Sequence, residues 1–143
     1  MFIGEYNHNL DEKGRLAIPA KFRTILKNGA VVTKGLDNCL FLYSKEQFEE
    51  IAKKIASLPL GQAKARAFTR HMISGAMDLE FDNQGRITLP EYLRKFSNLN
   101  KKVIVAGLYS HLEIWDETSW NKYKLNSEKN SNAIAEALGG LGI

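Results

Sequence analysis

Residues 11–23 read DEKGRLAIPAKFR, and residues 82–94 read DNQGRITLPEYLR. At a constant offset of 71, five positions are identical: Asp11/Asp82, Gly14/Gly85, Arg15/Arg86, Pro19/Pro90 and Arg23/Arg94. The apolar positions between them also match in kind. Because the identities include glycine and proline at a single offset, they indicate an internal duplication.

The similarity continues after a one-residue insertion, where VVTKGLDNCLFLYSKEQF at 31–48 matches VIVAGLYSHLEIWDETSW at 103–120. Two repeats are too few for a solenoid, so we expect a pseudo-symmetric pair in which the units complete each other's core. The predicted division is a first unit at 1–48, a helical connection at 49–75, a second unit at 76–120, and a C-terminal helix with a loose tail at 121–143.

Each unit is predicted to be an α+β body of short strands and helices. Residues 5–9 and 15–18 are expected to pair as a β-hairpin, because Asp11 supplies a side-chain acceptor for the turn and Gly14 a positive φ. Residues 77–89 repeat this pattern. A short helix is expected after each proline, and two more strands follow in each unit, at 30–33 and 40–43 in the first and near 103–106 and 112–115 in the second.

Helices flank these strands in the predicted fold. Ser44 and Asp116 are expected to cap two of them, and Ser44 with Gln47 forms a capping-box pattern. The residues expected to face inward are Phe22, Ile25 and Leu26 in the first helix, Phe48, Ile51 and Ile55 in the second, and Ala63, Ala67 and Phe68 in a helix at 62–73. Residues 126–132 are expected to be loose, and residues 133–138 to form a short helix.

Composition narrows the functional classes. The chain has 143 residues, of which 44% are hydrophobic and 25% charged, as in an ordinary globular domain. The single cysteine, Cys39, excludes an internal disulfide and a cysteine-based zinc site. Nothing approaches the roughly 18–20 apolar residues of a membrane helix, and the N-terminus lacks a signal-peptide pattern. We therefore expect a cytoplasmic protein with no membrane association.

Enzymatic motifs are scarce. His8, His71 and His111 are scattered without metal-ligand spacing, and the phosphate-binding glycine motifs of nucleotide enzymes do not occur. Cys39 and His111 occupy equivalent repeat positions and are interpreted as turn residues. We expect no catalysis, cofactor, metal or small-molecule substrate.

The repeated Asp-x3-Arg pattern is the strongest candidate for function. Its spacing across a glycine turn brings Asp11 near Arg15, and Asp82 near Arg86. In a purely structural interpretation the aspartate caps the turn and pairs with the arginine, which stabilises an exposed loop by only about 0–1 kcal/mol. In a functional interpretation the arginine reaches toward a phosphate or a guanine edge, because its planar guanidinium is always charged and bidentate. The two interpretations are compatible, with the aspartate structural and the arginine functional.

Charge supports the functional interpretation. The formal net charge is +4, and residues 1–71 hold 12 Lys and Arg against 7 Asp and Glu. The first loop carries Lys13 where the second carries Gln84, so the first is expected to hold phosphate more strongly, whereas Gln84 is a candidate adenine contact. Arg23 and Arg94 are left with two possibilities: contact with DNA, or an ion pair with a carboxylate inside the fold.

Together with the opening MFIGEYNHNLDEKGRLAIP, the duplicated DEKGR and DNQGR motifs closely resemble the MraZ family of bacterial transcriptional regulators over residues 1 to about 125. The resemblance implies two AbrB-like swapped-hairpin units forming a small barrel-like body with short flanking helices. It also implies ring-shaped homo-oligomers, a cytoplasmic, nucleoid-associated location, and binding of double-stranded promoter DNA at short direct repeats upstream of the division and cell-wall gene cluster.

The candidate site follows from this resemblance and from the loop chemistry. The expected DNA-binding residues are Lys13, Arg15, Gln84 and Arg86, and the expected loop-shaping residues are Asp11, Gly14, Asp82 and Gly85. The loops are expected to be exposed, so that a glycine substitution lowers binding before stability. The alternative is an oligomeric protein-interaction module, antitoxin-like or a scaffold, that does not bind DNA. Steep salt dependence would distinguish DNA binding from it.

Overall fold

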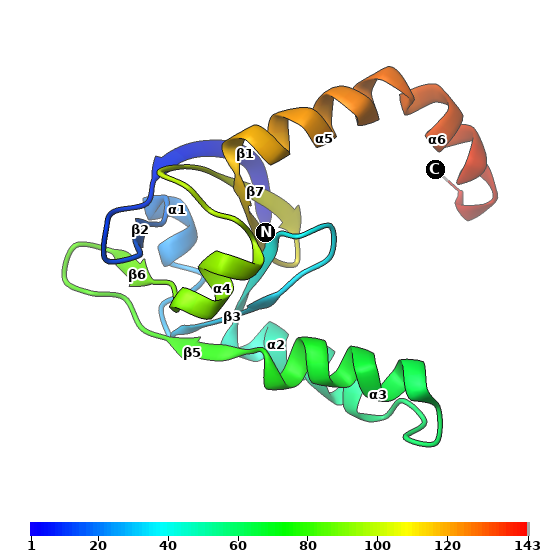
Figure 1. Cartoon of the computed structure of the whole chain (residues 1–143), viewed down its shortest axis with the longest axis horizontal. Helices are drawn as coiled ribbons and strands as arrows, with labels where there is room; N and C mark the ends of the chain where they lie inside the picture. The colour runs from blue at the N-terminus through cyan, green and yellow to red at the C-terminus, as the bar shows by residue number, and fades with distance from the viewer. Residues whose placement is uncertain (143) are drawn as a thin grey trace.

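The computed structural model describes residues 1–142, which form a mixed α/β fold with antiparallel strands and several helices (Figure 1). The strands are β1 (Phe2–Asn9), β2 (Arg15–Ala17), β3 (Ala30–Lys34), β4 (Leu40–Ser44), β5 (Met77–Leu79), β6 (Arg86–Thr88), β7 (Lys102–Tyr109) and β8 (Leu112–Asp116). The helices are α1 (Ala20–Arg23), α2 (Lys45–Ala56), α3 (Ala63–Thr69), α4 (Glu91–Phe96), α5 (Glu117–Lys129) and α6 (Ser131–Ala137), with a π-helix, η1 (Arg70–Ser74), and a 3-10 turn, η2 (Gly139–Leu141).

Strands from the two halves of the chain are interleaved. Six strands form one sheet in the order β1-β7-β8-β4-β3-β5, and β2 pairs with β6 in a second, two-stranded ribbon. Within residues 1–142, four of the six strand pairs join the first half to the second: β1–β7, β2–β6, β3–β5 and β4–β8. The halves therefore share their backbone hydrogen bonds.

The predicted local hairpins are wrong. β1 pairs with β7 rather than with β2, and β5 pairs with β3 rather than with β6. The turn before β2 carries the chain from the large sheet into the ribbon, and the turn before β6 does the same. Apolar alternation marks a strand, but it does not identify the strand's partner.

One core lies between the two repeats. The matched apolar positions of the duplication are all buried, and they belong to a single cluster: Leu16, Ile18 and Phe22 with Ile87, Leu89 and Leu93. Burying each such side chain stabilises the fold by roughly 1.5–3 kcal/mol. The core thus fixes the ribbon on the body of the protein.

The helix expectations are met in part. The Ser44 hydroxyl accepts a hydrogen bond from the Gln47 amide at 3.2 Å, which confirms the predicted cap. Asp116 stands at the start of α5 but does not cap it; its carboxylate accepts from Asn100 instead. Ile25, expected to face inward, is exposed, because α1 ends at Arg23.

The inward face predicted for the helix at 62–73 is also wrong. Ala65 and Met72 are buried, whereas Ala63, Ala67 and Phe68 are exposed. Ala65 and Met72 are seven positions apart, about two helical turns, so α3 and the π-helical turn η1 that follows it bury one continuous face, which is not the predicted one.

Helices also replace the expected loose segment, since α5 continues to Lys129 and α6 begins at Ser131. In Figure 1 the α2–α3 and α5–α6 segments extend from one side of the body, and the β2–β6 ribbon lies at the opposite side. Among the described residues, no helix has the length and apolarity needed to cross a membrane.

Candidate nucleic-acid interface

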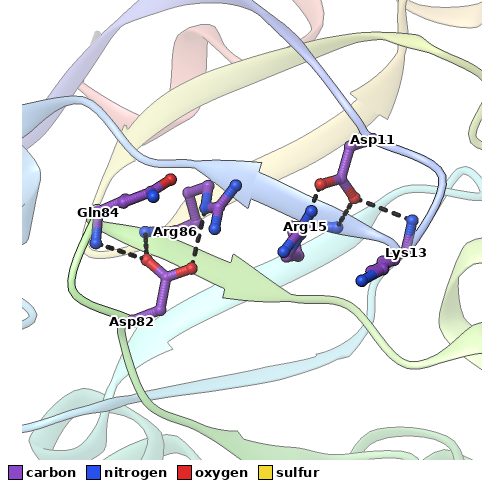
Figure 2. Close-up of polar contacts among 6 residues, drawn as sticks. All are labelled: Asp11, Lys13, Arg15, Asp82, Gln84 and Arg86. Atoms are coloured by element: carbon purple, nitrogen blue, oxygen red, sulfur yellow. Dashed lines mark hydrogen bonds and ion pairs between the residues drawn. The ribbon is translucent and has the colours of Figure 1, made fainter.

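The β2–β6 ribbon places the two repeated arginines on one face. Arg15 pairs with Thr88, Leu16 with Ile87, and Ala17 with Arg86. Because side chains alternate along a strand, Leu16 and Ile87 point into the core, where both are fully buried, and Arg15 and Arg86 point away from it. Figure 2 shows the two arginines on adjacent strands, each near the loop that precedes its strand.

The first loop, loop 1 (residues 11–15), is organised around one carboxylate. Oδ1 of Asp11 accepts hydrogen bonds from the amides of Lys13 at 3.0 Å and Arg15 at 2.8 Å. Oδ2 of Asp11 accepts from Nε of Arg15 at 2.5 Å. The Gly14 amide donates to the Asp11 carbonyl at 3.0 Å, which closes the turn.

The second loop, loop 2 (residues 82–86), repeats the same arrangement (Figure 2). Oδ1 of Asp82 accepts from the amides of Gln84 at 2.8 Å and Arg86 at 3.0 Å, and Oδ2 accepts from Nε of Arg86 at 2.9 Å. Two segments 71 residues apart therefore hold their arginines in the same way.

The electrostatics of both loops follow from these bonds. In each, the amide of the loop's own arginine is the main influence that holds the pKa of the aspartate below its usual range, and the guanidinium adds to it. Each aspartate thus stays ionised at neutral pH. Within residues 1–142, Nε is the only guanidinium nitrogen of Arg15 and of Arg86 that hydrogen-bonds to protein, so the terminal Nη groups keep their donors for a ligand.

The two other predicted DNA-binding residues are not brought together. Lys13 and Gln84 are both exposed, but their loops precede β2 and β6 at opposite ends of the antiparallel ribbon (Figure 2). Glu12 offsets the charge of Lys13, so the two loops carry equal formal charge. Arg15 has the more exposed side chain, at 33% against 25% for Arg86.

Gly14 and Gly85 have φ angles of +80° and +75°, the conformation that the turn pattern predicts and that glycine adopts without strain. Contrary to expectation, both glycines are buried, although the neighbouring loop residues are exposed. What covers them is an arginine from the other repeat: Arg94 lies against Gly14, and Arg23 against Gly85.

Of the two possibilities that the sequence leaves for Arg23 and Arg94, an ion pair with a carboxylate inside the fold is wrong. Nε of Arg94 donates to the Leu89 carbonyl at 3.0 Å, and Nε of Arg23 is buried without a partner. Among the described residues neither forms an ion pair with a carboxylate. Their repetition is visible in the sequence, but the loop that each one covers is not.

Among the described residues, no metal-binding cluster accompanies the two arginines on the ribbon. Within residues 1–142 no group of three or more His, Cys, Asp or Glu is placed to hold a metal ion. Cys39 is buried, and His111 stacks on Tyr43 with ring centroids 5.0 Å apart. Both side chains contribute to packing on the large sheet, away from the ribbon.

Comparison with known protein families finds the same duplication in this chain. A family model described as "MraZ protein, putative antitoxin-like" matches residues 1–71 and again residues 72–140. The chain belongs to the MraZ family. Each matched segment contains one of the two loops.

Full-length members of the MraZ family are close in sequence to this chain. It is 47% identical to the "Transcriptional regulator MraZ" of Alkaliphilus metalliredigens and 46% identical to that of Halothermothrix orenii, in both cases over all 143 residues and the whole of the relative. It is also 46% identical to the protein of the same name from Desulforamulus reducens, over 96% of this chain and 97% of that one.

Proposed function

We propose that this protein is a sequence-specific DNA-binding transcriptional regulator that works without catalysis or a cofactor. The observation that carries the proposal is the placement of Arg15 and Arg86 on one exposed face of the β2–β6 ribbon, each oriented by an aspartate. The names of the relatives support it, since all are transcriptional regulators.

The geometry of the ribbon suits duplex DNA. A two-stranded antiparallel ribbon fits the major groove, where arginine pairs with guanine. Arg15 and Arg86 are diagonal neighbours across the ribbon, so their Cα atoms lie roughly 7–8 Å apart. This matches about two steps along one DNA strand. Lys13 and Gln84, near the two ends, would contact flanking phosphate or bases.

The proposed architecture is a pair of AbrB-like swapped-hairpin units forming a small barrel-like body, with the units at 1–48 and 76–120. Two strand pairings support a two-fold relation between them. Leu16 faces Ile87, its counterpart at the offset of 71, and Phe41 faces Glu113, its counterpart at the offset of 72. Equivalent residues face each other in this way when a two-fold axis passes between their strands.

Binding at short direct repeats upstream of the division and cell-wall gene cluster, in the cytoplasm and on the nucleoid, completes the proposal. One ribbon neutralises few phosphates and would bind weakly. A ring of copies facing repeated DNA boxes would convert these weak contacts into avidity.

A ring also needs an apolar surface through which copies of the chain contact one another. Ile55 of the apolar α2 face is buried within the chain, and Phe48 and Ile51 are half-buried. Exposed apolar side chains lie instead on the helical segments opposite the ribbon, at Leu60, Phe68, Leu125, Ile134 and Leu138. Sedimentation that found only 16 kDa monomer at micromolar concentration would exclude the ring.

Substitution of the two arginines tests the function. Arg15→Ala and Arg86→Ala should each weaken promoter binding, by about 1–3 kcal/mol where the arginine reads a base. We expect the larger loss for Arg15→Ala, because Arg15 is more exposed and lies beside Lys13. Lys95→Ala is the matched control, since Lys95 is an exposed cation that pairs with Glu91 on α4.

The titrations use promoter and scrambled duplexes at several salt concentrations. A base contact relaxes sequence preference when it is lost, whereas a phosphate contact lowers affinity for both duplexes and makes the salt dependence shallower. If a folded, oligomeric Arg15→Ala/Arg86→Ala double variant binds the promoter at full strength, the ribbon is not the DNA-binding surface. Wild-type protein that shows no salt-dependent DNA affinity would favour the protein-interaction module.

A further inference from the structure

Arg23 and Arg94 occupy equivalent positions in the two repeats, and each side chain lies against the loop of the opposite repeat. Both residues are half-buried in the last turns of short helices, α1 and α4, that pack into the shared core. The contacts are crossed: Arg94 of the second repeat covers loop 1, and Arg23 of the first repeat covers loop 2.

At loop 1, the contact includes a short chain of hydrogen bonds. The Leu89 amide donates to the Gly14 carbonyl at 2.8 Å, and the Leu89 carbonyl accepts from Nε of Arg94 at 3.0 Å. A Cβ atom built on Gly14 would lie 2.7 Å from Nε of Arg94, so no larger residue fits between the loop and the guanidinium. Arg94 therefore fixes loop 1 against the strand end of the other repeat.

At loop 2, the same contact lacks one hydrogen bond. The Ile18 amide donates to the Gly85 carbonyl at 3.3 Å, and a Cβ atom on Gly85 would lie 2.6 Å from Cζ of Arg23. Nε of Arg23 is buried without a partner. An unpaired buried donor is destabilising, so contribution to folding does not by itself account for an arginine at this place.

We propose that Arg23 and Arg94 are positioning residues for DNA recognition: each holds the loop of the opposite repeat, so that Arg15 and Arg86 are presented to DNA as one rigid pair. The inference rests on the proposed function and adds a crossed dependence to it. Arg15 depends on Arg94, and Arg86 depends on Arg23, although each pair comes from different repeats.

Double-mutant cycles test the crossed dependence. Arg94→Met keeps the aliphatic stem but removes the guanidinium, and Arg23→Met does the same for loop 2. We expect each single variant to weaken promoter binding about tenfold, within the range of coupled neighbours. Arg94→Met should weaken promoter binding little further when Arg15→Ala is already present. Combined with Arg86→Ala, its full loss of affinity should multiply with the loss caused by Arg86→Ala. Arg23→Met should show the reverse pattern.

Two matched controls account for loss of charge. Lys95→Met removes an exposed cation next to Arg94 on α4, and Lys21→Met removes one close to Arg23 on α1. Both should leave the coupling patterns unchanged. Arg94→Lys keeps the charge but loses the Nε donor, so it should behave like Arg94→Met. Arg94→Lys also serves as the second variant if Arg94→Met does not fold.

Hydrogen exchange provides a readout without DNA. Arg94→Met should speed exchange at the amides of Gly14 and Arg15 and leave loop 2 unchanged, and Arg23→Met should act only on the amides of Gly85 and Arg86. The proposal is overturned if the losses of DNA affinity multiply in all four double-mutant cycles and hydrogen exchange at the loop amides is unchanged. That result would show that Arg23 and Arg94 contact phosphate directly. If Arg15→Ala and Arg86→Ala do not affect DNA binding, the proposed function fails, but the exchange pattern still decides whether the loops are held across the repeats.

Discussion

Replacing each loop glycine by alanine should destabilise the protein to different degrees, although the two loops have the same sequence pattern. Both substitutions place a Cβ atom on a backbone with positive φ, which costs about 1–2 kcal/mol. The difference arises from what each Cβ atom meets. We expect Gly14→Ala to be the more destabilising.

The structure gives the reason. At Gly14 the new Cβ atom would lie 2.9 Å from the Leu89 carbonyl oxygen, a backbone atom, and would disturb the hydrogen bond from Arg94 to that oxygen. Losing this bond adds about 1 kcal/mol, for a total of about 2–3 kcal/mol. At Gly85 the three nearest atoms all belong to the Arg23 side chain. That side chain can move aside, so the total stays at about 1–2 kcal/mol.

Urea unfolding at one fixed protein concentration measures this difference, because oligomerisation makes apparent stability depend on concentration. In thermal unfolding, Gly14→Ala should lower the Tm by roughly 4–12 °C, from about 2–4 °C per kcal/mol for a chain of this size. DNA affinity and stability should fall together, since both glycines are buried. Equal destabilisation by the two variants, or a larger effect of Gly85→Ala, would refute the assignment of these contacts.

Two further outcomes follow from the titratable groups. Hydrogen bonds hold the pKa values of Asp11 and Asp82 below the usual range, so the contribution of these carboxylates to loop order should be fully present above about pH 4 and lost as the pH falls through the lowered values. Loop amide signals followed by NMR from pH 7 to pH 2 check this expectation. Loss of the loop signals near pH 6 would contradict it. The Cys39 thiol is buried, and burial raises its pKa, so iodoacetamide should label Cys39 only as fast as the protein opens. Labelling at the rate of a free thiol in native buffer would show instead that the thiol is accessible.

The local features of the site could be predicted from the sequence. Asp-x3-Arg with glycine fixes a turn through bonds within five residues, so the roles of Asp11 and Gly14 in the loop geometry follow from the motif. The buried positions Leu16 and Ile87 follow from alternation. These features depend on near neighbours in the chain, which the sequence displays directly.

The remaining features depend on contacts between distant residues. The pairing of β1 with β7 joins residues about 100 positions apart, and no local pattern encodes it. The contact of Arg94 with Gly14 joins residues 80 positions apart. The polar segment 126–132 is rich in Asn and Ser, which are weak helix formers, so the sequence predicts a loose tail there. It is nevertheless helical apart from the junction at Asn130, and no glycine or proline interrupts residues 117–138.

The interleaving of strands has a consequence for synthesis on the ribosome. β1 emerges first, yet its partner β7 ends only at Tyr109. At roughly 5–20 residues per second, the first strand waits several seconds for its partner to be translated. During that time the first half, with its apolar strands β3 and β4, lacks the neighbours that complete its sheet. In a polysome, the first halves of adjacent nascent chains could therefore pair with each other, which makes the spacing of ribosomes on the message part of this protein's folding problem.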